Sequence, residues 1–171
     1  MPEGMFVFTS NVDGQFHKAG FSGKHVHECH GSIHHLQCLD GCMSDIWAAE
    51  DFHPAIDEES GQLTSDFPRC QYCDGIARPN ILMFGDGGWL GYRSDLQEAN
   101  FKAWRRKAQR PVVIEIGAGR SIPTVRRFGE EQNGFLIRIN PNDPDVNGLA
   151  CMSFRLGGLE ALRGIEAALG T

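Results

Sequence analysis

The segment "PVVIEIGAGRSIPTVRRFGEEQNGFLIRIN", residues 111–140, carries the clearest structural pattern in the chain. Its first part, Pro111 to Gly117, is a continuous apolar run that predicts a buried strand. Residues 121–131 predict a helix, and Pro123 falls in its first turn, where proline is tolerated. Phe135 to Asn140 predicts a second strand. Two buried strands separated by a helix indicate a parallel pair joined by a crossover.

The same alternation extends to both sides of this segment. Asn80 to Phe84 is an apolar run that predicts a further strand, and Met5 to Phe8 predicts a short one near the start. A helix is expected over residues 94–109, opened by a capping box of Ser94 and Gln97. Its apolar positions fall on one face: Leu96, Ala99, Ala103 and Trp104.

A last amphipathic helix is expected over residues 157–170, with Leu159, Leu162, Ile165 and Leu169 on its apolar face. Strands that alternate with helices predict an α/β fold: a Rossmann-like parallel sheet with helices on both faces. Ligands of such sheets bind at the carboxyl ends of the strands. Three loops lie there: "TSNVDG" (9–14), "GAGRS" (117–121) and "NPND" (140–143). The Gly-x-Gly of the second is compatible with a phosphate loop and equally with a tight strand-to-helix turn.

The composition restricts the class of protein. The 171 residues are 41% apolar and 22% charged, which is typical of a globular domain. A formal charge of -6 argues against a general nucleic-acid binder. The sequence has no apolar run of the ~20 residues that a membrane span requires. Its start does not read as a signal peptide, so we expect no membrane partner and a cytoplasmic location.

The cysteines form two close pairs and two single residues. Cys38 and Cys42 are followed 28 residues later by Cys70 and Cys73, with Pro68 before and Gly75 after the second pair. Two such pairs can converge on one tetrahedral zinc. The alternatives are four unrelated buried thiols or a redox pair in "CQYC", and His34 or His35 could replace Cys42 as a ligand. Cys29 and Cys151 are interpreted as small core residues.

Five segments together resemble a known family. "TSNVDGQFHKAG" (9–20), "HECHGSIHHLQC" (27–38), "CQYCDGIARPNILMFGD" (70–86), "VVIEIG" (112–117) and "RIN" (138–140) are similar, in order and spacing, to motifs of the sirtuins, the NAD-dependent protein deacylases. The resemblance covers nearly the whole chain and is most specific in the first three segments.

The resemblance implies roles for residues at the cofactor site. His30 aligns with the catalytic base, and Asn11 and Asp13 with residues that line the nicotinamide and ribose pocket. Asn140 aligns with an asparagine at the adenosine ribose. The loop under the cofactor corresponds to Gly117, Ala118 and Gly119. His27, His34 and His35 are interpreted as surface or linking residues.

The resemblance also implies a metal and a substrate. One structural zinc per chain would be bound by Cys38, Cys42, Cys70 and Cys73. An acyl-lysine peptide would lie as an added strand against Phe84, Gly85 and Asp86. In sirtuins the amide oxygen of the acyl-lysine attacks the ribose as nicotinamide leaves, and a histidine then removes a ribose proton so that the acyl group migrates. Imidazole suits this task because its ordinary pKa is about 6.5.

The chain departs from the family pattern in several places. Ser10 occupies the position of a glutamine in the family, and Asp86 occupies the position of a glutamate. The segment "GAGRS" replaces a Gly-Thr-Ser run. This replacement removes a hydroxyl that would reach a phosphate and adds Arg120, whose side chain could reach one. The family's glycine-rich phosphate loop precedes the Thr-x-Asn-x-Asp-Gly motif and is expected to be missing here. We therefore expect weak or no activity from this chain alone.

Two domains are expected: residues 1–29 with 78–171 as a partial Rossmann-like NAD-binding domain, and residues 30–77 as a zinc-binding module. The predicted function is an NAD-dependent protein-lysine deacylase. Two alternatives remain open. One is an inactive, zinc-stabilised remnant that binds a peptide or ADP-ribose, and the other is a zinc-ribbon scaffold without a small-molecule site.

Overall fold

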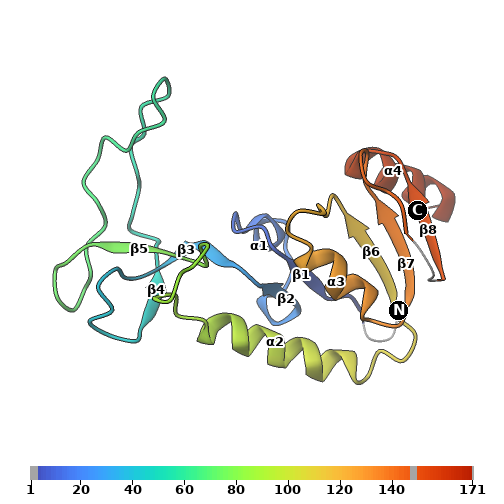
Figure 1. The fold of residues 1–171 in the computed structure, drawn as a ribbon, viewed down its shortest axis with the longest axis horizontal. Helices are drawn as coiled ribbons and strands as arrows, with labels where there is room; N and C mark the ends of the chain where they lie inside the picture. The colour runs from blue at the N-terminus through green and yellow to red at the C-terminus, as the bar shows by residue number, and fades with distance from the viewer. Residues whose placement is uncertain (1–3, 147–149, 171) are drawn as a thin grey trace. The chain divides into compact units, whose positions relative to one another are not determined.

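The computed structural model describes residues 4–146 and 150–170. The chain divides into two compact units, Met1–Trp104 and Arg105–Thr171, and each unit is described by itself below. Figure 1 shows the course of the chain through the two units. The elements of the first unit are β1 (Val7–Thr9), α1 (Gln15–Lys18), the 3-10 turn η1 (Gly23–His25), β2 (Val26–Glu28), β3 (Gly31–Cys38), β4 (Ile46–Ala48), β5 (Ala77–Ile81) and α2 (Tyr92–Arg105).

Strands β1 and β2 form a parallel pair, with Val7 opposite Val26 and Thr9 opposite Glu28. The predicted strand at residues 5–8 is thus confirmed with its bounds moved by one to two residues. All three residues of β2 are buried. Because two parallel strands end at the same edge, the segments that follow Thr9 and Glu28 emerge side by side.

A second sheet is antiparallel, in the order β4-β3-β5. The predicted strand Asn80–Phe84 is wrong in extent and in pairing: β5 spans Ala77–Ile81 and lies antiparallel to β3. Its continuation is solvent-exposed, with Phe84 88% exposed. An apolar run alone does not distinguish a buried parallel strand from an edge strand with an exposed continuation. Between β4 and β5 a long loop extends away from this sheet (Figure 1).

The buried face of α2 differs from the predicted one. Leu96 is 65% exposed, and Ala99 and Ala103 are exposed too, whereas Ser94, Gln97 and Phe101 are buried. The capping box is wrong as well, since the helix begins at Tyr92 and both polar side chains point to β2 instead. The buried backbone of β2 needs hydrogen-bond partners, and that need outweighs the burial of Leu96.

The second unit contains a parallel sheet in the order β6-β7-β8. Its elements are β6 (Val112–Ile116), α3 (Thr124–Glu130), β7 (Phe135–Ile139), β8 (Cys151–Phe154) and α4 (Gly158–Leu169). The predicted strands at 111–117 and 135–140 are confirmed to within one residue, and β8 was not predicted. Leu136 and Ile139 of β7, each 1% exposed, form the centre of the core.

Helices α3 and α4 were both predicted, and the buried face of α4 differs from the expected one. Gly129 of α3 lies against Val113 and Glu115, so α3 covers that face of the sheet. On α4, Ala161 is buried, while the leucines of the expected apolar face are exposed. In the part of the chain that the structure describes, no helix is long and apolar enough to cross a membrane.

Candidate functional site

The parallel pairing of β1 and β2 brings two candidate regions together at one edge. Asn11 and Asp13 follow β1, and His30 follows β2. Hydrogen bonds join the two segments: Cys29 N donates to Thr9 O over 3.0 Å, and Ile33 N donates to Val12 O over 2.9 Å. The candidate base and the candidate cofactor-pocket residues therefore lie in adjoining loops of the same unit.

The backbone conformation after His30 requires a glycine at position 31. Its φ of 81° lies in the left-handed region, and a Cβ placed there would be 2.0 Å from Asn80 O. Only glycine permits this approach of β5 to β3. The approach also lets Leu82 N donate to His30 O over 3.0 Å. The backbone at His30 is thus fixed on one side to the segment that continues toward Phe84.

A buried ion cluster forms around Glu28, two residues before His30 in the chain. Glu28 is 1% exposed, and its carboxylate accepts a hydrogen bond from Arg93 Nη2 over 2.5 Å. His17 Nε2 lies 3.5 Å from the same oxygen. Sequence reasoning missed Glu28 and Arg93, because no local pattern links residues 65 positions apart. The cluster connects β2 to α1 and to α2. Helix α1 follows the loop with Asn11 and Asp13, and α2 follows the exposed segment after β5.

His27 is not a surface residue, contrary to the prediction. It is 6% exposed, and its Nε2 lies 3.0 Å from Ser94 Oγ in α2. Burial lowers its pKa below the ordinary value, so the imidazole is neutral near pH 7. His27 therefore belongs to the packing of β2 against α2, and not to a metal site.

Asp86 organises the exposed segment after β5. Its carboxylate accepts from Arg78 Nη2 over 2.5 Å and from Gly88 N over 3.2 Å. The Arg78 guanidinium lowers the pKa of this carboxyl below its usual range. Phe84 and Gly85 are exposed in the turn that Asp86 closes. Of the three predicted substrate residues, Asp86 thus shapes the turn while Phe84 presents a free apolar surface.

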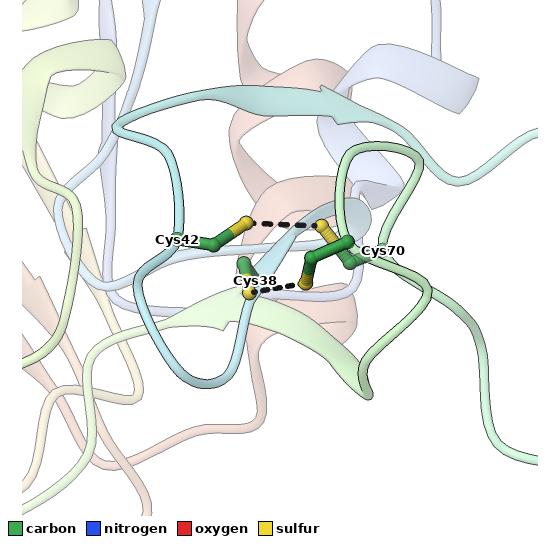
Figure 2. Close-up of side chains that lie close together, drawn as sticks. Cys38, Cys42 and Cys70 are labelled. Atoms are coloured by element: carbon green, nitrogen blue, oxygen red, sulfur yellow. Dashed lines mark hydrogen bonds between the residues drawn. The ribbon is translucent and has the colours of Figure 1, made fainter.

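The four predicted zinc ligands converge (Figure 2). The sulfurs of Cys38, Cys42, Cys70 and Cys73 all lie within 4.8 Å of one another. Two separations are shorter, 3.9 Å between Cys38 and Cys73 and 3.5 Å between Cys42 and Cys70. A tetrahedral zinc with Zn–S bonds of about 2.3 Å requires sulfurs about 3.8 Å apart. The cluster therefore fits one zinc, and the alternatives of unrelated thiols and of a histidine ligand in place of Cys42 are wrong.

The electrostatics of the cluster also favour a cation. The backbone N–H of Cys42 lowers the pKa of the Cys38 thiol to about 7. Cys42 itself shares hydrogen bonds with the other sulfurs, Cys73 first, and its pKa is raised. One thiolate forms easily, but a second beside it is opposed by the first. A bound divalent cation removes this opposition, because it stabilises every thiolate that contacts it.

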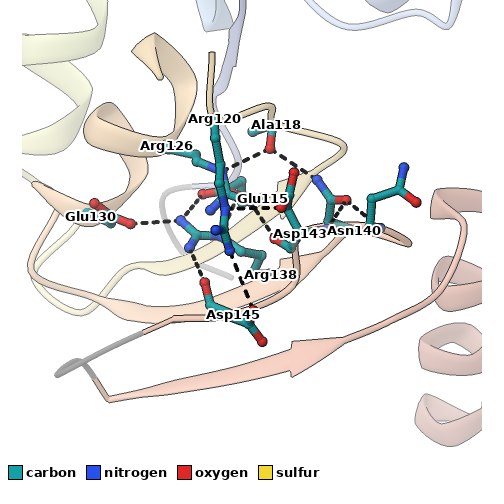
Figure 3. A network of polar contacts seen from close by, with 10 residues as sticks. Glu115, Ala118, Arg120, Arg126, Glu130, Arg138, Asn140, Asp143 and Asp145 are labelled. Carbon is teal, nitrogen blue, oxygen red and sulfur yellow. Dashed lines mark hydrogen bonds and ion pairs between the residues drawn. The ribbon is translucent and has the colours of Figure 1, made fainter. Parts of the chain in front are cut away.

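The second unit brings the predicted loops at 117–121 and 140–143 together (Figure 3). Asn140 Nδ2 donates to Ala118 O over 3.0 Å. Asn140 Oδ1 accepts from the backbone N–H groups of Asn142 and Asp143, each over 2.9 Å. The Asn140 side chain is 6% exposed and is engaged within the two loops. Its assignment to a ribose contact stays a prediction.

Three arginines surround these loops. Arg126 and Arg138 are buried, at 7% and 1% exposure, and sequence reasoning missed both. Arg120, in contrast, is 56% exposed and pairs with Asp143 over 3.1 Å and with Asp145 over 3.4 Å. Exposed ion pairs of this kind are weak. A contact between Arg120 and a ligand phosphate stays a prediction, and in the structure the side chain is engaged by Asp143 and Asp145.

Comparison with known proteins now defines the class. The model of the Sir2 family matches residues 2–124, which is most of the chain. The chain belongs to the Sir2 family, the sirtuins. A protein of Fusarium oxysporum f. sp. cubense named "Probable bifunctional ADP-ribose hydrolase/ADP-ribosyltransferase" is 31% identical over 138 residues, which cover 74% of this chain and 23% of that protein.

Two further relatives are named NAD-dependent protein deacylase. The one from Aquifex aeolicus is 28% identical, covering 88% of this chain and 56% of the relative. The one from Aeropyrum pernix is 27% identical, covering 96% of this chain and 60% of the relative. The chain thus spans at most 60% of these three curated relatives.

The fold is that of solved sirtuin structures. "Structure of Sir2Tm bound to a propionylated peptide" matches with a TM-score of 0.64 at 22% identity, over 96% of this chain and 64% of that one. "Sir2-p53 peptide-NAD+" matches with a TM-score of 0.63 at 23% identity, over 96% and 63%. The predicted α/β fold with a zinc-binding module is thereby confirmed.

Proposed function

We propose that this chain is part of an NAD-dependent protein-lysine deacylase and carries its base, its zinc module and its acyl-lysine docking segment. The observation that carries the proposal is the junction in the first unit. There the loop with Asn11 and Asp13, the residue His30 and the segment from Leu82 onward are joined by backbone hydrogen bonds. Membership of the Sir2 family and the names of the two deacylase relatives support it.

In this proposal each candidate residue has a separate task. Bound NAD supplies the ribose that receives the acyl group. An imidazole nitrogen of His30 takes a proton from a ribose hydroxyl. Asn11 and Asp13 line the pocket of the nicotinamide and its ribose. The acyl-lysine peptide adds a strand along the exposed segment that ends at Asp86, where main-chain hydrogen bonds give affinity.

A zinc ion bound by the four cysteines would hold the base in place without taking part in the reaction. Cys38 ends β3, the strand that begins with Gly31, directly after His30. Fixing Cys38 in a four-thiolate site therefore fixes one end of the strand whose other end carries the base. A cytoplasmic location is part of the same proposal, supported by the four-cysteine cluster, because closely spaced cysteines that can hold a metal are typical of a reducing compartment.

The test is a product analysis with the protein of this sequence. Acetyl-lysine and propionyl-lysine peptides are incubated with NAD, and free peptide, nicotinamide and O-acyl-ADP-ribose are measured by mass spectrometry. We expect slow deacylation that requires NAD and is lost in His30→Ala. The exposed His25→Ala is the matched control and should retain the wild-type rate. Deacylation that survives His30→Ala would contradict the role of His30, and a wild type that binds NAD but deacylates neither peptide would contradict the proposed reaction.

A second candidate is ADP-ribosyl transfer or ADP-ribose binding without deacylation. It is favoured by the similarity to the Fusarium protein named as a bifunctional ADP-ribose hydrolase/ADP-ribosyltransferase. The same assay separates the two candidates. Covalent addition of ADP-ribose to a protein, with no acyl transfer, would favour this second candidate. Binding of peptide or ADP-ribose without any turnover would favour the inactive remnant.

A further inference from the structure

Arg126 binds both loops at the carboxyl edge of the second unit's sheet. It lies on α3 and is 7% exposed. Its Nε donates to Ala118 O over 2.9 Å, and its Nη2 donates to Asp143 O. One guanidinium thus holds a carbonyl group from the loop after β6 and another from the loop after β7 (Figure 3).

Two further side chains reinforce the same arrangement. Asn140 Nδ2 is a second donor to Ala118 O, over 3.0 Å. Arg138 Nη1 donates to Asp145 O over 2.9 Å, while its other nitrogens bind the carboxylate of Glu115 over 2.6 and 2.7 Å. Every one of these bonds to a loop ends on a backbone carbonyl. The two arginines and Asn140 therefore orient these loop carbonyl groups toward the interior of the second unit.

The inward carbonyl of Ala118 sets the direction of the next N–H group. The Ala118–Gly119 peptide bond is trans, and in a planar trans peptide the N–H points opposite to the C=O. Because Ala118 O faces Arg126 and Asn140, the Gly119 N–H points away from both. Nothing lies within 4 Å of where a Cβ of Gly119 would stand. The Gly119 N–H is thus directed away from the two side chains that bind Ala118 O, and the open space beside Gly119 Cα lets a ligand approach this part of the loop.

The composition of the loop makes this donor important. Gly117, Ala118 and Gly119 carry no side-chain hydroxyl or amide. Any hydrogen bond that these three residues give to an oxygen of a ligand must come from the backbone. A backbone donor binds well only if its direction is fixed beforehand.

We propose that Arg126 is a positioning residue for the cofactor: it fixes the Ala118–Gly119 peptide so that the Gly119 N–H donates to an oxygen of the ADP-ribosyl part of NAD. The inference rests on the proposed function, since it assumes that this edge binds NAD. Arg126 does not touch the cofactor in this account and acts only through the loop.

The test measures ADP-ribose affinity by calorimetry in the wild type, Arg126→Gln, Arg126→Lys and Arg127→Gln. Arg127 is the exposed neighbour on the same helix and serves as the matched control. We expect Arg126→Gln to weaken binding about tenfold, which corresponds to roughly one hydrogen bond. Arg126→Lys keeps the charge and one donor and should lose about threefold, while Arg127→Gln should match the wild type.

A spectroscopic measurement separates positioning from general stability. In the wild type, the amide proton of Gly119 should shift downfield when ADP-ribose is added, as expected for a new hydrogen bond. In Arg126→Lys this shift should shrink, with the affinity for an acyl-lysine peptide unchanged. If Arg126→Gln does not fold, the lysine variant decides by this shift.

Two results would overturn the inference. Wild-type ADP-ribose affinity in Arg126→Gln would do so while the proposed function stands. An unshifted Gly119 amide in a wild type that binds ADP-ribose would do the same. If the wild type binds neither ADP-ribose nor NAD, the proposed function fails and the inference fails with it.

Discussion

Two regions of this molecule bring ionisable side chains close together, and they differ in whether the chain itself supplies a cation. In the zinc module four thiols lie within 4.8 Å of one another. In the second unit the carboxylates of Glu115 and Glu130 both bind the guanidinium of Arg138. The first region requires a cation from solution, whereas the second has a cation bound covalently to its own backbone. The first should therefore respond to chelators and redox conditions, and the second only to mutation.

Zinc removal should give the largest effect. Chelation under reducing conditions should unfold the segment from β3 to β5, because structural zinc contributes roughly 10–16 kcal/mol to the folding of small metal modules. Metal analysis should find one zinc per chain, and limited proteolysis should cut within β3 and β5 only after chelation. Cys70→Ser should reproduce the metal-free state.

Cys151→Ser is the control for this prediction, since Cys151 lies outside the cluster. It should retain one zinc and full protection. Less than one zinc per chain in the reduced wild type would show that the four-cysteine site is wrong.

The second-largest loss of stability is expected for Arg138→Met. It leaves Glu115, which is 3% exposed, as a buried charge without its partner, and such losses cost about 3–5 kcal/mol of unfolding free energy. Urea unfolding measures this cost. Arg127→Met removes an exposed arginine and should change the free energy of unfolding by less than about 0.5 kcal/mol.

The double variant Arg138→Met with Glu115→Leu completes the comparison. It removes both charges and should recover much of the lost stability, because an apolar pair of similar volume can replace a buried ion pair. A double variant as unstable as the single one would mean that packing, and not the uncompensated charge, caused the loss.

Gln97→Ala should have a smaller but measurable effect. The Gln97 side chain accepts from Glu28 N over 3.0 Å, and its loss leaves that buried N–H unpaired, at a cost of about 1–3 kcal/mol. Leu96→Ala, at a position 65% exposed, should cost less than about 0.5 kcal/mol. If thermal unfolding shows the reverse order, the helix buries the face that the sequence predicted.

The smallest effect should be a dependence on pH at His35. Burial, followed by the nearby Arg93, lowers its pKa to about 4. The unfolded imidazole, with a pKa of about 6.5, takes up its proton first, so stability should fall as the pH drops from about 6.5 toward 4. Above pH 6.5 this group contributes no pH dependence.

Thermal midpoints of the wild type and His35→Gln between pH 7.5 and 5 test this prediction. The variant should have the flatter profile. Zinc loss at low pH affects both proteins, so only the difference between them reports on His35. The exposed His53→Gln should follow the wild type, and parallel profiles for all three would contradict the prediction.

Much of the fold followed from local patterns, and the failures share one cause. The strands β6 and β7 were predicted within a residue because each is a short apolar run with turns on both sides. Ser94, Gln97 and His27 were misjudged because polar side chains read locally as surface residues. They are buried because side chains of α2 form hydrogen bonds with β2 that join residues separated by 67 and 69 positions in the sequence.

The sequence by itself indicated two cysteine pairs suited to zinc, the strand–helix–strand pattern and the family motifs, since each of these depends on spacing along the chain. Only the tertiary structure decided the Arg138–Glu115 pair and the hold of Arg126 on Ala118 and Asp143. These contacts depend on the register that places Glu115 beside Arg138 in neighbouring strands. Register is a property of two paired segments, so neither segment alone contains it.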